Sequence, residues 1–363
     1  MNTLRPWIGL AALVDVLGCR NLHRILAHVD GDASAAWHAT PALLAASGCS
    51  PAIVQKWSTA HHAIDCDALT AAIDHASITV IPHGDARYPA ALATIPDPPI
   101  ALFVRGNPDT LLASPLLAVV GTRAASPYGI AATTHLVEPL ARAGCTIVSG
   151  LAYGIDAVAH RVCVEQHGRT VAVLGTGTDA RNISPATHRG LAEAILQNNG
   201  AVVSEYVPGT PGIPMHFPAR NRIVAGLTAG TVVVEAPMDS GALITAQFAL
   251  DFGREVFAVP GPITSALHAG VHALLKTGAT PVTDARDLLD LIPLPATLPL
   301  PMAAPRDPIA ARILDALGAA PAHADALHAA LGISAAILAS TLTSLELDGA
   351  IRNVGGGRYI RVG

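Results

Sequence analysis

Short runs of β-branched and other apolar residues alternate with helix-length stretches in the middle of the chain, and no other feature limits the fold as strongly. The runs lie at residues 117–120, 145–149, 170–174, 201–204, 231–235 and 255–259. Strands that alternate with helices along a sequence form parallel sheets with helices on both faces. Strands in such sheets are apolar along their whole length because both faces are buried. The sequence therefore predicts an α/β fold built on a doubly wound, mainly parallel sheet.

Glycines and polar residues gather where the predicted strands end. Gly121, Thr122 and Arg123 follow the first strand, and Gly150 and Gly154 follow the second. In an open parallel sheet, ligands bind beyond the carboxyl ends of the strands. A glycine at such a position allows a tight turn and leaves backbone amides accessible. We therefore expect a ligand site at this edge of the sheet.

The turn after the first predicted strand also contains the start of a helix. Ser126 is a suitable N-cap, and Pro127 suits the first helical position. A helix start offers unpaired backbone amides to a phosphate, here beside Arg123. The glycine spacing is not GxGxxG, and no acidic residue follows at the end of the second strand, so an NAD site is disfavoured. A plain glycine turn with a surface arginine would have the same residues.

Two further helix starts carry groups that suit a nucleic acid. The first contains Phe217, Arg220, Asn221 and Arg222. Its arginines can form paired hydrogen bonds with phosphates, and its aromatic ring can stack on a base. The second begins at Ser240 and Gly241 and offers another anion-binding helix terminus. A solvated helix start is the alternative interpretation of the first.

Residues 1–75 are rich in alanine and have a helical periodicity that is interrupted at Gly18 and Gly48. Two short helix-turn-helix pairs would fit, and the second interruption resembles a helix-hairpin-helix loop, which can bind a DNA phosphate. The four basic residues of this segment are outnumbered by six acidic ones. Because phosphate binding normally needs a basic surface, the pattern favours an accessory or packing role over DNA contact.

The C-terminal part of the chain has the pattern of a separate small domain. The proline-rich residues 296–308 have the composition of a linker. Helical stretches at 309–317, 324–331 and 334–348 precede two short strands, 350–354 and 358–362, which flank three glycines. Three helices and a β-hairpin predict a winged helix. Because its third helix carries acidic residues and no basic one, a protein-contact or structural role is at least as well supported as binding in a DNA groove.

Composition excludes several classes of protein. Hydrophobic residues make up 51% of the chain and charged residues only 13%, which excludes disorder for the bulk of it. The five cysteines include no CxxC pair and fit neither a disulfide framework nor a zinc module. No apolar stretch approaches the ~20 residues that span a bilayer, so we expect a soluble, cytoplasmic protein without membrane contact. The net charge of -5 means that local arginines must hold any polyanion.

Metal binding and catalysis have little support in the sequence. Of the 16 histidines, only His268 and His272 have helical spacing near the sheet edge, and no HExxH glutamate accompanies them. No Ser-His-Asp set can be nominated from spacing alone. We therefore expect no metal, no cofactor and no catalytic residue.

Five segments, in order along the chain, resemble signature blocks of the DNA-processing protein A (DprA/Smf) family. They are residues 121–123, 149–156, 217–222, 235–245 and 259–261. The resemblance implies an extended Rossmann domain at 76–295, between a sterile-alpha-motif-like domain at 1–75 and a winged helix at 309–363. It also implies a homodimer that binds and protects incoming single-stranded DNA and loads the RecA recombinase in natural transformation and recombination.

The resemblance also implies which residues hold the DNA. The expected site consists of Gly121, Thr122, Arg123, Gly150, Gly154, Phe217, Arg220, Asn221, Arg222, Ser240 and Gly241. We expect Arg123, Arg220 and Arg222 to lie along one edge of the sheet and to face the same DNA strand.

An enzyme is the alternative. The nucleoside-monophosphate phosphoribohydrolases of the lysine-decarboxylase-like family share this Rossmann variant and resemble a PGGxGTxxE pattern. When Thr245 is aligned with the threonine of that pattern, Phe248 occupies the position of the glutamate. Without a carboxylate there for acid-base work, hydrolysis is disfavoured.

Overall fold

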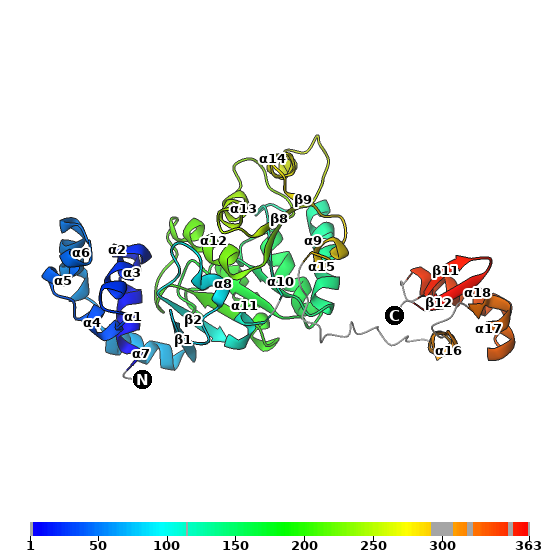
Figure 1. Ribbon diagram of the computed structural model, residues 1–363, viewed down its shortest axis with the longest axis horizontal. Coiled ribbons are helices and arrows are strands. Elements are labelled where there is room, and N and C mark those ends of the chain that lie inside the picture. Colours follow the sequence, from blue (N-terminus) through cyan, green and yellow to red (C-terminus); the bar gives the residue numbers. More distant parts are fainter. Residues whose placement is uncertain (1–2, 114, 292–307, 318–321, 348–350, 362–363) are drawn as a thin grey trace. The chain divides into compact units, whose positions relative to one another are not determined.

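The computed structural model describes residues 3–113, 115–291, 308–317, 322–347 and 351–361 (Figure 1). The chain divides into two compact units, Met1–Leu298 and Pro299–Gly363. The expected linker at 296–308 lies outside the described residues except for Pro308.

A nine-stranded sheet with the order β1-β2-β6-β5-β4-β3-β7-β8-β9 organises the first unit. Its strands are β1 (Ile78–Pro82), β2 (Ala101–Gly106), β3 (Leu116–Val120), β4 (Thr146–Ser149), β5 (Thr170–Val173), β6 (Ala201–Ser204), β7 (Gly230–Val233), β8 (Glu255–Ala258) and β9 (Thr280–Pro281). All neighbours from β6 to β9 pair in parallel, whereas β1 and β2 form an antiparallel pair that joins β6. The predicted doubly wound, mainly parallel sheet is confirmed, and β1, β2 and β9 are additions to it.

Helices cover both faces of the sheet. One face carries α8 (Ala90–Ala93), α12 (His216–Leu227), α13 (Gly241–Asp251) and α14 (Ala269–Lys276). The other carries α9 (Pro127–Arg142), α10 (Ile155–Glu165), α11 (Arg189–Gln197) and α15 (Ala285–Leu289). Three short 3₁₀ turns, η1 (Pro108–Leu111), η2 (Ala186–His188) and η3 (Ala266–His268), lie in the connections.

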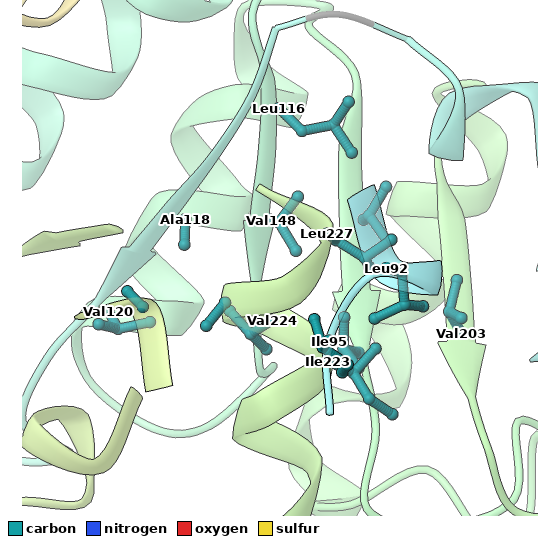
Figure 2. Packing of buried hydrophobic residues seen from close by; sticks show 14 of the residues in the cluster. Leu92, Ile95, Leu116, Ala118, Val120, Val148, Val203, Ile223, Val224 and Leu227 are labelled. Carbon is teal, nitrogen blue, oxygen red and sulfur yellow. The ribbon is translucent and has the colours of Figure 1, made fainter. Parts of the chain in front are cut away.

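The central strands divide their side chains between two apolar cores. Along β3, Leu117 and Val119 pack with α9 and α10, while Ala118 and Val120 pack with α12. This alternation follows from the two-residue repeat of a strand, and it explains why β3 is apolar throughout. Figure 2 shows the core on the α12 side, where Ile223 and Leu227 of α12 lie beside Leu92 of α8 and Val224 lies nearer to Val120 of β3. Burial on both faces fixes where the strand ends and their loops lie.

Seven short helices form the N-terminal part of the first unit. They are α1 (Arg5–Ala12), α2 (Val14–Leu17), α3 (Cys19–His28), α4 (Ala33–Trp37), α5 (Pro41–Ala46), α6 (Pro51–His61) and α7 (Cys66–His75). Gly18 ends α2 with a φ of 75°, and Gly48 lies in the turn after α5 with a φ of 84°. Both values fall in the left-handed region that favours glycine. Ile8 of α1 packs with Val80 and Phe103, so these helices share a core with the antiparallel edge of the sheet.

The second unit is a winged helix. It contains α16 (Pro308–Ala316), α17 (Ala324–Leu331), α18 (Ala335–Leu347), β10 (Ala322–His323), β11 (Ile351–Gly355) and β12 (Arg358–Arg361), with the strand order β10-β12-β11. Ile313, Leu327 and Leu342 are buried in its core. Within the described residues no single helix is long and apolar enough to cross a membrane, although α17 and most of α18, bent by 119°, meet the length and composition criteria as a pair.

Candidate functional site

A pocket of about 370 Å³ lies at the carboxyl edge of the sheet, where the loops after β3, β4 and β7 meet the starts of α12 and α13. Nine of the eleven residues expected from the sequence line it. They are Gly121, Thr122, Arg123, Gly150, Phe217, Arg220, Asn221, Ser240 and Gly241. The sheet thus brings together turns that are more than a hundred residues apart in the sequence, as the position of the strand ends predicts.

The loop after β3 is held from both sides. The Thr122 amide donates to the Glu235 carbonyl at 2.7 Å, and the Thr122 carbonyl accepts from the Ile155 amide at 3.2 Å. A Cβ at Gly121 would lie 2.5 Å from the Ile155 side chain, so only glycine fits there. Arg123 follows with an exposed side chain at the rim of the pocket. The backbone that presents this cation is therefore fixed.

Gly154 does not line the pocket. Its φ is +74°, and a Cβ at this position would overlap the Thr122 carbonyl oxygen. Gly154 therefore lets the β4 loop pack against the backbone of Thr122 and Arg123, and it supports the position of Arg123. Gly154 was expected among the DNA-binding residues; it lies outside the pocket lining, and its contact with DNA stays a prediction.

Arg220 lies in the interior of the pocket wall with only 5% of its surface exposed. Its guanidinium occupies the space beside Gly150, where a Cβ would overlap Nη1 and Nη2. Burial lowers the pKa of Arg220 to about 10, an effect that Asp156 opposes and Arg123 increases. Among the described residues, Nε and Nη1 have no hydrogen-bond acceptor. A buried cation that keeps its charge at neutral pH and has unused donors needs an anionic partner.

Asp156 supplies the negative charge nearest to this arginine. Its Oδ2 accepts hydrogen bonds from the amides of Gly150 at 3.0 Å and Ala152 at 3.4 Å. Burial raises the pKa of Asp156, while the Arg220 charge and the amide hydrogen bonds oppose that rise. The carboxylate thus stabilises the β4 loop and partly balances Arg220.

Phe217 and Asn221 continue the wall along α12. Phe217 is half-buried, and its ring lies 3.1 Å from where a Cβ of Gly212 would be. The Asn221 side-chain amide donates to the Gly241 carbonyl at 3.2 Å, which ties α12 to the start of α13. Ser240 caps α13 by accepting from the Ala242 amide. The start of α13 therefore faces the pocket with a capped first turn.

The start of α9, for which the sequence left a phosphate site and a plain glycine turn open, is occupied by a carboxylate of the chain. Glu235 is fully buried, and its carboxylate accepts from the Ser126 amide at 3.0 Å and the Ser126 hydroxyl at 2.5 Å. The Glu235 carboxylate lies so close to Gly129 in the same turn that a Cβ at position 129 would overlap it. Because a carboxylate of the chain itself already neutralises this helix terminus, an external phosphate has no access to it.

Arg222 also differs from the expectation. It is 6% exposed, and its two terminal nitrogens contact both carboxylate oxygens of Glu205, at 2.8 and 2.6 Å. Burial would lower the pKa of Arg222, but the Glu205 charge reverses this and raises it. Two positions along an α-helix correspond to a rotation of about 200°, so Arg220 and Arg222 point to opposite sides of α12. The three arginines therefore do not lie along one edge.

Within the described residues, no group of three or more His, Cys, Asp or Glu side chains could hold a metal ion. His268 and His272 have ring centroids 6.2 Å apart. His268 is buried beside Glu235, and burial lowers its pKa.

The doubly wound sheet, the pocket with its buried cation at the carboxyl edge, and the winged helix define a two-unit protein with a Rossmann-like first unit. Residues 79–293 match the profile of the family described as DNA recombination-mediator protein A, and residues 296–357 match the DprA winged helix domain. The chain belongs to the DNA recombination-mediator protein A (DprA/Smf) family, as the sequence blocks indicated.

Curated relatives share sequence with a little over half of the chain. Protein Smf from Escherichia coli is 46% identical over 211 residues, which cover 58% of this chain and 56% of the relative. The DNA processing protein DprA from Streptococcus pneumoniae is 46% identical over 202 residues, covering 56% of this chain and 70% of the relative. The chain thus spans just over half the length of the Escherichia coli relative.

Two solved structures resemble the fold. The X-ray structure of DprA from Streptococcus pneumoniae has a TM-score of 0.67 and 36% identity, and covers 78% of this chain and 96% of that one. The DprA structure from Helicobacter pylori, described as showing a unique single-stranded DNA binding mode, has a TM-score of 0.54 and 27% identity. It covers 60% of this chain and 95% of that one.

Proposed function

We propose that this protein binds single-stranded DNA in the pocket at the carboxyl edge of the sheet. Arg123 at the rim and Arg220 in the wall hold backbone phosphates, and Phe217 stacks on a base. The observation that carries the proposal is the buried Arg220 guanidinium with two nitrogens that lack an acceptor among the described residues. Phosphate oxygens can accept from the unused guanidinium donors and balance the Arg220 charge, which otherwise has Asp156 as its counter-charge.

The neighbouring groups favour a single strand over a duplex. Phe217 offers a half-buried aromatic face at the pocket. Bases of a single strand can stack on such a face, whereas bases inside a duplex are already stacked on one another. The chain as a whole carries a net charge of -5, so binding depends on the local cations and not on a general basic surface. The single-stranded DNA binding described for the Helicobacter pylori relative supports the same conclusion.

We further infer the role that the family resemblance implies. The protein protects incoming DNA in the cytoplasm and loads the RecA recombinase onto it during natural transformation, as a homodimer and without catalysing a reaction. Large exposed apolar side chains at the β7–β8 end of the first unit, including Met238, Ile244 and Ile263, are available for a protein partner. Sedimentation of the full chain tests the dimer. RecA-dependent ATP hydrolysis on single strands coated with a single-strand-binding protein tests the loading.

Fluorescence anisotropy with labelled single-stranded and duplex oligonucleotides tests DNA binding directly. We expect tighter binding of the single strand and a loss of affinity in Arg123→Ala. Arg142→Ala is the matched control, because Arg142 is an exposed arginine at the far end of α9 that pairs with Glu138. Equal affinity for both DNA forms, or an equal effect of the two substitutions, would contradict the proposal.

A further inference from the structure

We propose that Tyr153 is a second base-stacking surface, and that the DNA strand leaves the pocket over the β4 loop toward β5. This inference rests on the proposed single-stranded DNA binding and adds the direction of the strand. Tyr153 follows Ala152, which lines the pocket, and its side chain is 48% exposed. An exposed ring directly beside a phosphate pocket is placed to receive the base of the next nucleotide.

The Tyr153 ring is held in position before any ligand binds. Its hydroxyl accepts a hydrogen bond from the Thr187 hydroxyl at 3.1 Å, and its ring meets the buried His188 ring edge to face at 5.0 Å. His188 is itself fixed by a 2.8 Å contact between Nδ1 and the Leu151 carbonyl. An aromatic side chain that is already ordered loses little entropy when a base stacks on it.

The backbone under Tyr153 is equally constrained. Leu151 has a φ of 56° and Gly154 a φ of 74°, so the residues on both sides of the tyrosine form a tight turn. The Gly150 and Ala152 amides are bonded to Asp156. Such a turn presents Tyr153 in one orientation, which is the property that a stacking surface needs.

The charges on the neighbouring loops set the direction. In the sheet, β4 lies between β3 and β5. A DNA strand that passes from Arg123 over Tyr153 therefore next meets the residues that follow β5. Arg181 and Arg189 are exposed there and outnumber the one acidic residue, Asp179, whose carboxylate accepts from the Gly209 amide at 2.8 Å and the Asn182 side chain at 2.7 Å. A DNA backbone is attracted to this side of the pocket.

The opposite direction is unfavourable. Residues 234–240 and 259–268, which follow β7 and β8, contain Glu235 and Asp239 but no lysine or arginine. Tyr128 on that side resembles Tyr153, since it is 43% exposed. Its hydroxyl donates to the Pro260 carbonyl, and its ring meets the His268 ring edge to face. Because the two tyrosines differ in the charge around them, Tyr128 provides a matched control.

The experiment compares oligothymidylates of two lengths on the full chain by anisotropy, one of about four nucleotides that fills the pocket and one of about twelve that extends past it. We expect Tyr153→Ala to weaken binding of the longer oligonucleotide roughly five- to hundredfold and to change the shorter one little. Tyr153→Phe keeps the ring and should bind like the parent, as should Tyr128→Ala. A photoreactive bromodeoxyuridine in the longer oligonucleotide should cross-link to the peptide that contains Tyr153.

The outcomes separate the two proposals. If the parent protein binds neither oligonucleotide, the proposed function itself fails. If the parent binds and Arg123→Ala weakens binding, but Tyr153→Ala and Tyr128→Ala have equal effects on the longer oligonucleotide, the stacking role of Tyr153 is overturned. If Tyr153→Ala lowers the midpoint temperature of thermal unfolding, the Tyr153→Leu variant is used in place of Tyr153→Ala, and its affinity is compared with that of Tyr153→Phe. An affinity of the leucine variant equal to that of the phenylalanine variant also overturns the role.

Discussion

Arg222 and Glu205 form a two-point ion pair in the interior of the first unit, with Nη1 2.8 Å from Oε1 and Nη2 2.6 Å from Oε2. Cys19, at the start of α3, contacts both partners through its sulfur, at 3.3 Å from Nη2 and 3.4 Å from Oε2. The pair therefore connects α12, the residue after β6 and the N-terminal helices. The helix that carries Arg220 toward the pocket is anchored on its other side by this contact.

Removing one partner of this pair should destabilise the first unit strongly. Glu205→Ala leaves the buried Arg222 charge with only the more distant Asp97 carboxylate, 3.7 Å from Nε, and such a loss costs about 3–5 kcal/mol of unfolding free energy. Urea unfolding followed by tryptophan fluorescence measures this, because all three tryptophans, at positions 7, 37 and 57, lie in the N-terminal segment. Glu193→Ala is the control, since its pair with Arg105 is partly exposed and should contribute about 1 kcal/mol or less. Equal midpoints for the two variants would disprove the anchoring role.

Salt dependence should distinguish the cationic residues of the pocket from the aromatic one. Each phosphate neutralised on a single strand adds about 0.7 to the slope of log affinity against log salt, so Arg123→Ala should flatten the slope by about that amount. Phe217→Ala should cost about 1–3 kcal/mol of binding free energy and leave the slope unchanged, because no charge is lost. Affinities across a salt series provide both quantities. A parental slope in Arg123→Ala would mean that this arginine contacts no phosphate.

The cysteines should be unreactive in the folded protein. All five are buried, and burial raises the pKa of Cys19 to about 12 and that of Cys145 to about 11. Because only the thiolate reacts, iodoacetamide at about pH 8.5 should modify none of them in the native state and all five in urea, as counted by intact mass. The raised pKa values also mean that the stability these thiols contribute is complete below about pH 9 and is lost as the pH rises toward 12. Native labelling at one site would show that this thiol is accessible.

No nucleoside monophosphate should be hydrolysed at its N-glycosidic bond. The position that aligns with the glutamate of the hydrolases is Phe248, whose ring stacks on Phe252 with centroids 5.7 Å apart. Incubation of the full chain with each nucleoside monophosphate and an assay for ribose 5-phosphate test this expectation. Product above the level of a heat-inactivated sample would restore the enzyme interpretation.

The winged helix should contribute little to single-strand affinity. Every residue that lines the pocket belongs to the first unit, Met1–Leu298. A chain that ends after residue 298 should therefore keep the affinity and the salt slope of the full chain. A loss of more than about tenfold, or about 1.4 kcal/mol, would move part of the binding site to the second unit.

The parallel part of the fold could be predicted because its strands are apolar on both faces, a pattern that few other structures produce. The antiparallel strands were missed for two physical reasons. β1 ends in Pro82, which is unfavourable within a strand, and β2 lies after a connection of 18 residues that hides the pairing. β9 has only two residues and no pattern of its own.

The site was predictable where it depends on strand ends and not where it depends on contacts. Gly150 and Arg220 are 70 positions apart, so nothing local indicates that the glycine makes room for the guanidinium. The opposite orientation of Arg222 could have been predicted, because residues two positions apart on an α-helix do not share a face. The contact between Glu235 and the start of α9 could not have been predicted, because Glu235 follows β7 and is 109 positions from Ser126 in the sequence.

The carboxylate of Glu235 at the first turn of α9 also determines which cofactors this fold excludes. In related sheets the same turn binds the pyrophosphate of a dinucleotide. Here that position already holds an anion of the chain itself, hydrogen-bonded to the Ser126 amide and hydroxyl and in close contact with Gly129. A dinucleotide would have to displace a buried charge before it could bind, so competition from within the chain adds to the missing glycine motif as an obstacle to an NAD-like cofactor.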